Sequence, residues 1–179
     1  QERHRRKERE ARISALRAVE LFNPLSNEEI ETLSDHLRYA PFAKGETMTR
    51  QGAVAHWLYL MTSGTADICV AVPEGPRHTI ATLTAPCVFG EMGLMTGEPR
   101  AANVIATSDI ECFRLDKVGF EQIVKNRPEI VKELSGLLAK RRVELLALRE
   151  GLSADQAKSR ETGERDRILL RIQDFFGLS

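Results

Sequence analysis

The feature that most restricts the fold of this chain is a series of short β-prone segments between residues 39 and 115. Each segment is four to seven residues long, and turns containing glycine or proline separate most of them. The segments are Thr47–Arg50, Trp57–Met61, Ala66–Val72, His78–Leu83, Asn103–Thr107 and Ile110–Leu115. Short strands at this spacing predict an antiparallel sandwich, barrel or roll.

Helical patterns lie on both sides of this β-rich part. The first twenty residues are highly charged and carry only a narrow apolar stripe at helical spacing. Ser26 and Glu29 form a capping box that starts a second helix. Asp116 is placed to cap a short helix after the last strand, and Pro128 suits the first turn of a long helix that Gly151 ends.

The remaining residues are less regular. Residues 153–165 are polar and only weakly determined, whereas residues 168–176 form an amphipathic helical pattern. We therefore predict an α+β fold, in which N-terminal and C-terminal helices flank an antiparallel, jelly-roll-like β-roll. The predicted divisions are a charged linker helix (1–20), the roll with flanking helices (21–127), a long helix (128–150) and an extension with one amphipathic helix (151–179).

Composition excludes several classes of function. Basic and acidic residues number 26 each, so the chain lacks the basic footprint of a nucleic-acid-binding protein. The three cysteines form no CxxC pair and predict neither a zinc site nor a disulfide framework. There is no Walker pattern and no motif for nucleophilic catalysis. We therefore expect no metal, no nucleic-acid partner and no enzymatic activity.

Residues 89–104 have the composition of a phosphate-binding segment. Gly90 and Gly93 allow close approach to the backbone, and residues 91–95 can form one helical turn whose first amides attract an anion. Arg100 offers a bidentate fork for phosphate oxygens, and Glu91 can accept hydrogen bonds from sugar hydroxyls. One phosphate and one ribose together describe a cyclic mononucleotide.

The same segment resembles the phosphate-binding cassette of the cyclic-nucleotide-binding domain family. It reads FGE, then a small residue, leucine and a hydrophobic residue, then PRAA. The turns around Lys44-Gly45-Glu46, Gln51-Gly52 and Ser63-Gly64 are also similar to those of the family's β-roll. The resemblance covers about residues 21–149, and we refer to residues 89–104 as the cassette.

The resemblance implies a role for each matching residue. Glu91 would bind the ribose 2′-hydroxyl and Arg100 the cyclic phosphate. Backbone amides would complete the cradle, namely those of Gly90, Met92, Gly93, Leu94 and Ala101. Either Val70 or Val72 would pack against the base.

The base also requires a lid and a means of discrimination. Arg141 matches the lid position on the long helix, where its guanidinium can stack on the purine, and Leu145 is the apolar alternative. Ala101 offers no hydroxyl to the guanine amino group, so we expect cAMP to be preferred over cGMP. A plain solvated helix face is the other interpretation of Arg141.

The tail and the charged N-terminal helix resemble bacterial channels related to the small mechanosensitive channel. This implies a sensor at the cytoplasmic face of the membrane, which regulates an attached ion channel through ligand-driven movement of its C-terminal helix. The chain begins at Gln1 rather than methionine, so we expect a transmembrane channel portion upstream. The alternatives are a Crp-type transcription regulator without its DNA-binding part, a kinase regulatory subunit, or a non-binding interaction module. Self-association is left open.

Overall fold

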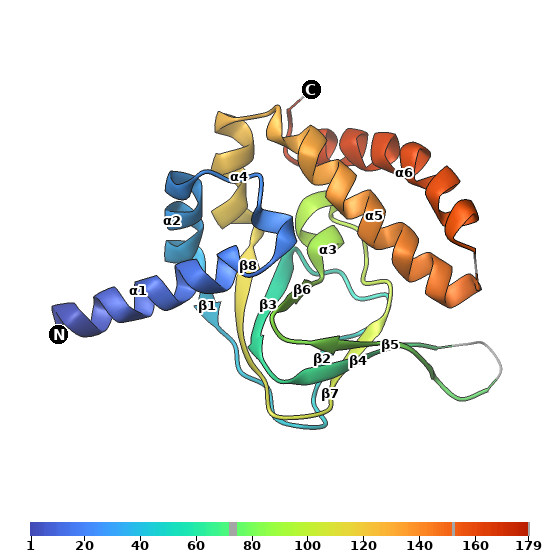
Figure 1. The fold of residues 1–179 in the computed structure, drawn as a ribbon, viewed down its shortest axis with the longest axis horizontal. Coiled ribbons are helices and arrows are strands. Elements are labelled where there is room, and N and C mark those ends of the chain that lie inside the picture. Colours follow the sequence, from blue (N-terminus) through green and yellow to red (C-terminus); the bar gives the residue numbers. More distant parts are fainter. Residues whose placement is uncertain (72–74, 152, 179) are drawn as a thin grey trace.

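The computed structural model describes residues 1–71, 75–151 and 153–178, without the side chains of residues 149, 154 and 162. The strands described form two four-stranded antiparallel sheets, in the orders β1-β8-β3-β6 and β2-β7-β4-β5. Their bounds are β1 (Arg38–Tyr39), β2 (Thr47–Thr49), β3 (Trp57–Ser63), β4 (Thr65–Val70), β5 (His78–Thr84), β6 (Cys87–Phe89), β7 (Asn103–Ala106) and β8 (Glu111–Asp116). The predicted antiparallel β-roll is therefore confirmed (Figure 1).

Helices cover one side of the roll. They are α1 (Glu2–Arg17), a 3₁₀ turn (Glu20–Phe22), α2 (Asn27–His36), α3 (Glu91–Thr96), α4 (Lys117–Asn126), α5 (Ile130–Glu150) and α6 (Ala154–Phe175). The first half of α1 projects from the molecule, whereas α5 and α6 lie together over α3 (Figure 1). None of the described helices is both long and apolar enough to cross a membrane.

Strand β3 explains how one sheet serves two cores. Successive side chains of a strand point to opposite faces of the sheet. Leu58 and Leu60 accordingly pack in the core formed with the helices, while Tyr59 and Met61 pack inside the roll. This hydrophobic strand is thus buried on both faces, which fixes the helices against the roll.

Three local features differ from the sequence-based expectation. Residues 154–165 are helical, because Ser153 and Gln156 form a capping box that starts α6. The short strands β1 and β6 were not predicted. Asp116 does precede α4, but its carboxylate accepts no hydrogen bond from the first amides of that helix. It pairs instead with Arg114, with an Arg114 Nε to Asp116 Oδ1 distance of 2.7 Å.

Candidate functional site

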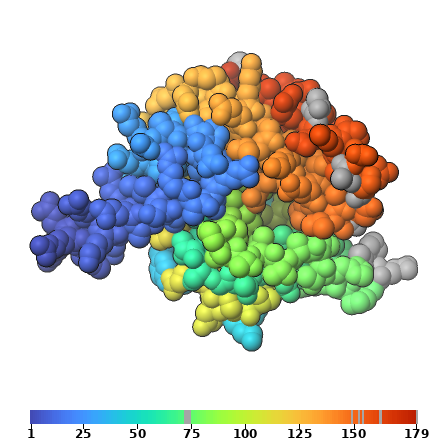
Figure 2. Space-filling model, viewed as in Figure 1, coloured from blue at the N-terminus to red at the C-terminus, as the bar shows by residue number. Residues whose placement is uncertain are grey.

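A cavity of about 330 Å³ lies between the cassette, the strands of the second sheet and α5. In the space-filling view the surface is hollowed between α5 and the green strands below it (Figure 2). Most of the predicted site residues line this cavity: Gly90, Glu91, Met92, Gly93, Arg100, Ala101, Arg141 and the alternative lid residue Leu145. The fold therefore gathers the cassette and the predicted lid around one space of ligand size.

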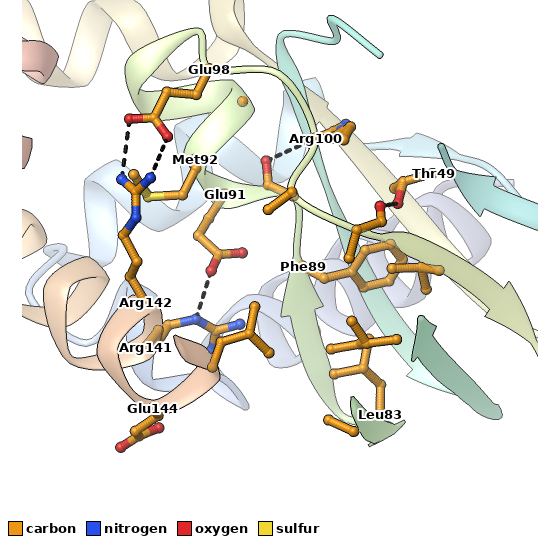
Figure 3. A pocket seen from close by; sticks show the side chains of 18 of the residues that line it. Thr49, Leu83, Phe89, Glu91, Met92, Glu98, Arg100, Arg141, Arg142 and Glu144 are labelled. Carbon is orange, nitrogen blue, oxygen red and sulfur yellow. Dashed lines mark hydrogen bonds and ion pairs between the residues drawn. The ribbon is translucent and has the colours of Figure 1, made fainter. Parts of the chain in front are cut away.

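Glu91 and Arg141 join the cassette to the long helix. The Arg141 Nε donates to Glu91 Oε1 at 2.9 Å, and its Nη2 donates to the Val88 carbonyl at 2.6 Å (Figure 3). The neighbouring Glu91 carboxylate raises the pKa of Arg141 above its ordinary value, because it favours the charged guanidinium. Within the described residues, the second Glu91 oxygen has no protein hydrogen-bond donor. It is therefore available to a ligand hydroxyl.

Arg100 also lines the cavity and is almost fully buried, with 7% of its surface exposed. Its Nη1 donates to the Gly90 carbonyl at 2.8 Å, and its Nη2 donates to the Trp57 carbonyl at 2.7 Å. Burial lowers the pKa of Arg100, but an arginine stays charged at neutral pH. Two of its five N–H groups thus hold the guanidinium beside α3. The held guanidinium gives the wall of the cavity a positive charge at a fixed position.

Two of the cassette glycines, Gly90 and Gly93, have a role that sequence reasoning missed. A Cβ at Gly90 would lie 2.5 Å from Arg100 Nη1, and one at Gly93 would lie 2.7 Å from the same atom. Gly90 also has a φ of 80°, a conformation that L side chains rarely adopt. At Gly93 the Ala55 carbonyl oxygen would lie even closer to the Cβ. Gly90 therefore makes room for the arginine and Gly93 for both the arginine and the Ala55 backbone, whereas the sequence suggested only close approach of a ligand.

The other end of the cavity is apolar. Its walls are formed by Ile68, Ala81, Leu83, Phe89, Val104 and Leu148. Sequence reasoning placed Phe89, Glu98 and Val104 within the cassette without giving them a role. It did not identify the other lining residues of this group, namely Thr49, Ile68, Ala81, Leu83, Arg142, Glu144 and Leu148. For α5 a signal existed, because positions 141, 144, 145 and 148 follow helical spacing and share one face. The cavity is therefore charged near the cassette and apolar near the second sheet (Figure 3).

Two of the predicted contact residues do not line the cavity. Leu94 is fully buried in the core formed with the helices, and its amide donates to the Gly90 carbonyl at 3.4 Å. Val70 is buried inside the roll and is not among the lining residues, whereas Ile68 of the same strand is. Val72, the other residue expected against the base, lies outside the described residues.

Glu98 forms a second link between the cassette and the helices. Its carboxylate accepts from Arg142 of α5, with an Arg142 Nη2 to Glu98 Oε2 distance of 3.0 Å (Figure 3). It also accepts from Arg171 of α6. Among the residues described, no group of three or more His, Cys, Asp or Glu side chains is placed to hold a metal ion.

Comparison with known proteins identifies this architecture. Residues 40–127 match the family model of the cyclic nucleotide-binding domain. The chain is 28% identical over 140 residues to the cyclic AMP receptor protein of Thermus thermophilus, covering 78% of this chain and 65% of that protein. It is 26% identical to the cAMP-dependent protein kinase regulatory subunit of Blastocladiella emersonii, covering 72% of this chain and 32% of that subunit.

Solved structures agree with this match. The regulatory domain of Toxoplasma gondii PKA with cAMP has a TM-score of 0.67 and 28% identity, covering 77% of this chain and 51% of that one. Residues 40–127 are therefore a domain of the cyclic nucleotide-binding family. The chain spans less than two thirds of the two curated relatives described above.

Proposed function

We propose that this chain is a regulatory sensor that binds cAMP in preference to cGMP in the cavity between the cassette and α5. The observation that carries the proposal is the presence of Glu91 and Arg100 in the wall of one cavity that is apolar away from the cassette. A cyclic nucleotide has the same division, since its charged phosphate and its ribose hydroxyl lie at one end and its flat base at the other.

Each part of the ligand has a matching wall. Arg100 and the amides of the first turn of α3 would bind the phosphate, and the free Glu91 oxygen would accept from the ribose 2′-hydroxyl. The base would lie among the apolar residues, beneath Arg141 and Leu145 of α5. Ala101 lines the cavity without a hydroxyl for the guanine amino group, which favours cAMP.

Binding would act on α5 through a population shift. The Arg141–Glu91 ion pair already places α5 against the cassette, so a ligand in the cavity would add contacts to the closed arrangement. A ligand changes such an equilibrium only by its difference in affinity between the two states. The chain would thus convert nucleotide binding into a change in the position of its C-terminal helices.

For the partner, we propose a channel portion upstream in the same polypeptide, reached through α1. Residues 2–11 of α1 are exposed along their whole length, as expected of a helix that continues toward another part of a protein. The ligand-binding part of a Crp-type regulator is the second candidate, favoured by the match to the cyclic AMP receptor protein. Sequencing the gene on both sides tests this: membrane-spanning helices upstream support the channel, and a winged helix-turn-helix downstream supports the regulator.

Calorimetric titration of the purified chain with cAMP and cGMP tests the sensor itself. Arg100→Gln should weaken cAMP binding about 100-fold, because it removes a charge-assisted contact to the phosphate. Arg114→Gln is the matched control, since Arg114 also lies over the Trp57 ring but does not line the cavity. No heat with either nucleotide would make the chain a non-binding module, and equal losses in both variants would reduce Arg100 to a structural role.

A further inference from the structure

Helix α6 lies beyond the residues that match the family, yet it is built into the same core. Ile168, Ile172 and Phe176 are at most 2% exposed and pack in the cluster that contains β3, α4 and α5. The helix lies along α5 and also contacts α3 (Figure 1). It is therefore positioned to act on both the cassette and the lid.

The first contact is made where α3 ends. Gly97 has a φ of 75°, and a Cβ at this position would lie 2.6 Å from the Phe175 ring of α6. Two other side chains hold the Phe175 ring in place. The His56 ring centroid lies 5.1 Å from the Phe175 ring centroid, and the Lys117 Nζ lies 3.8 Å from the same Phe175 centroid. Lys117 also donates to the Phe175 carbonyl at 3.0 Å. The end of α3 thus rests on an immobilised aromatic side chain.

The second contact is an ion-pair cluster around Glu98, the residue that follows Gly97. Its side chain is only 17% exposed and lies between Arg142 of α5 and Arg171 of α6. The Arg142 Nε in turn lies 3.8 Å from the Glu164 Oε2 of α6. Three separate elements therefore meet at one carboxylate.

Charge explains why this carboxylate needs two arginines. Glu98 lines the cavity only two residues before Arg100, so its negative charge would oppose an anionic ligand. The cavity wall carries three glutamates and three arginines, namely Glu91, Glu98, Glu144, Arg100, Arg141 and Arg142. Arg171 does not line the cavity but adds a fourth positive charge at its edge.

We propose that Arg171 is a positioning residue for the nucleotide site, and that α6 is a brace which holds Glu98 and Arg142 in the arrangement that receives the ligand. The proposal rests on the proposed function. Phe175 supports the end of α3, and Arg171 neutralises Glu98 and keeps it turned toward the helices. Nucleotide affinity then depends on a helix that lies outside the family domain.

The test compares three variants of α6. Arg171→Gln removes the charge, Arg171→Lys keeps it, and Arg160→Gln removes a different α6–α5 ion pair, that of Arg160 with Glu150 at 3.1 Å. We expect Arg171→Gln to raise the dissociation rate of a fluorescent cAMP analogue about three- to tenfold, the range for losing a partly buried ion pair. Arg171→Lys should recover most of this change, and Arg160→Gln should stay within about twofold of the parent.

Hydrogen–deuterium exchange without nucleotide separates the brace from the sensor. Arg171→Gln should speed exchange in residues 90–98 and along α5, whereas Arg160→Gln should leave the cassette unchanged. If the parent binds cAMP and the two glutamine variants behave alike in both measurements, the brace is refuted. If the parent binds no nucleotide, the proposed function fails, and hydrogen exchange alone tests whether α6 acts as a brace. Faster exchange of the cassette in Arg171→Gln than in Arg160→Gln then supports the brace, and equal exchange in the two variants refutes it.

Discussion

The two walls of the cavity are held in different ways. On the roll side, Arg100 is buried and donates to two backbone carbonyls, those of Gly90 and Trp57. On the helix side, Arg141 and Arg142 of α5 are about one-third exposed and pair with the carboxylates of Glu91 and Glu98. Backbone acceptors belong to the sheet and α3 and cannot turn away, whereas carboxylates on flexible side chains can.

This difference assigns separate tasks to the two walls. The roll wall is preformed, because moving Arg100 would break its two charge-assisted hydrogen bonds to backbone carbonyls, at a cost of about 1.5–3 kcal/mol each. The helix wall is adjustable, because its ion pairs can be exchanged for water or ligand at a small cost. A sensor requires both properties, since one wall recognises the ligand and the other reports that it is bound.

The largest expected effect tests whether α6 belongs to the helix wall as a structural part. Ile172→Ala removes a side chain that is fully buried against the common core, so it should lower the free energy of unfolding by about 2–4 kcal/mol. Leu170→Ala, on the same helix but 67% exposed, should change it by less than about 0.5 kcal/mol. Urea denaturation measures both, and equal effects would mean that α6 merely rests on the surface.

The cassette and the lid residues Arg141 and Leu145 could be predicted from the sequence, whereas the contacts that α6 makes with the cavity could not. Gly90, Glu91 and Arg100 lie within eleven consecutive residues, so a local pattern specifies their arrangement. The Glu98 cluster depends on Arg171, which lies 73 positions further along the chain, and no local pattern predicts such a pairing. The start of α6 could have been predicted from a capping box that was overlooked. Ser153 and Gln156 form a box of the same kind as Ser26 and Glu29, which start α2.

The prediction that Val70 or Val72 contacts the base stays a prediction, and the sequence of β4 alone does not decide it. Ile68 and Val70 alternate along the strand, and both pack inside the roll. Of this pair, Ile68 lines the cavity and Val70 does not. The cavity is also walled by β5, the cassette and α5, so which residue of one strand face reaches it depends on segments that are distant in the sequence.

The second effect compares a thiol near the helix wall with one inside the roll. Burial raises the pKa of Cys87 to about 11 and that of Cys112 to about 12, against an ordinary value of 9.0. The folded state therefore holds these protons more tightly than the unfolded chain does. Their contribution to stability is complete below pH 9 and is lost as pH rises through 11 to 12.

Replacing each cysteine isolates its share of this loss. Cys87→Ala and Cys112→Ala should each reduce the fall in unfolding free energy between pH 8 and pH 11 by at most about 2 kcal/mol. Arg141 lowers the pKa of Cys87, so Arg141→Gln should raise the pKa of that thiol and leave Cys112 unchanged. Urea unfolding and the pH dependence of thiol alkylation measure these changes. If the unfolding free energy of both alanine variants falls between pH 8 and pH 11 by as much as that of the parent, neither thiol is buried as described.

The smallest effect bears most directly on the helix wall. Arg141→Gln removes the ion pair to Glu91 and the donor to the Val88 carbonyl, so the closed position of α5 loses about 1 kcal/mol. Affinity for cAMP should then fall about threefold to tenfold, mainly through faster dissociation. Lys140→Gln is the control, because Lys140 is half-exposed and lies 4.0 Å from Glu20, away from the cavity. Tighter binding in Arg141→Gln would reverse the assignment: Arg141 would then compete with the ribose for Glu91, and the helix wall would oppose the ligand that the roll wall recognises.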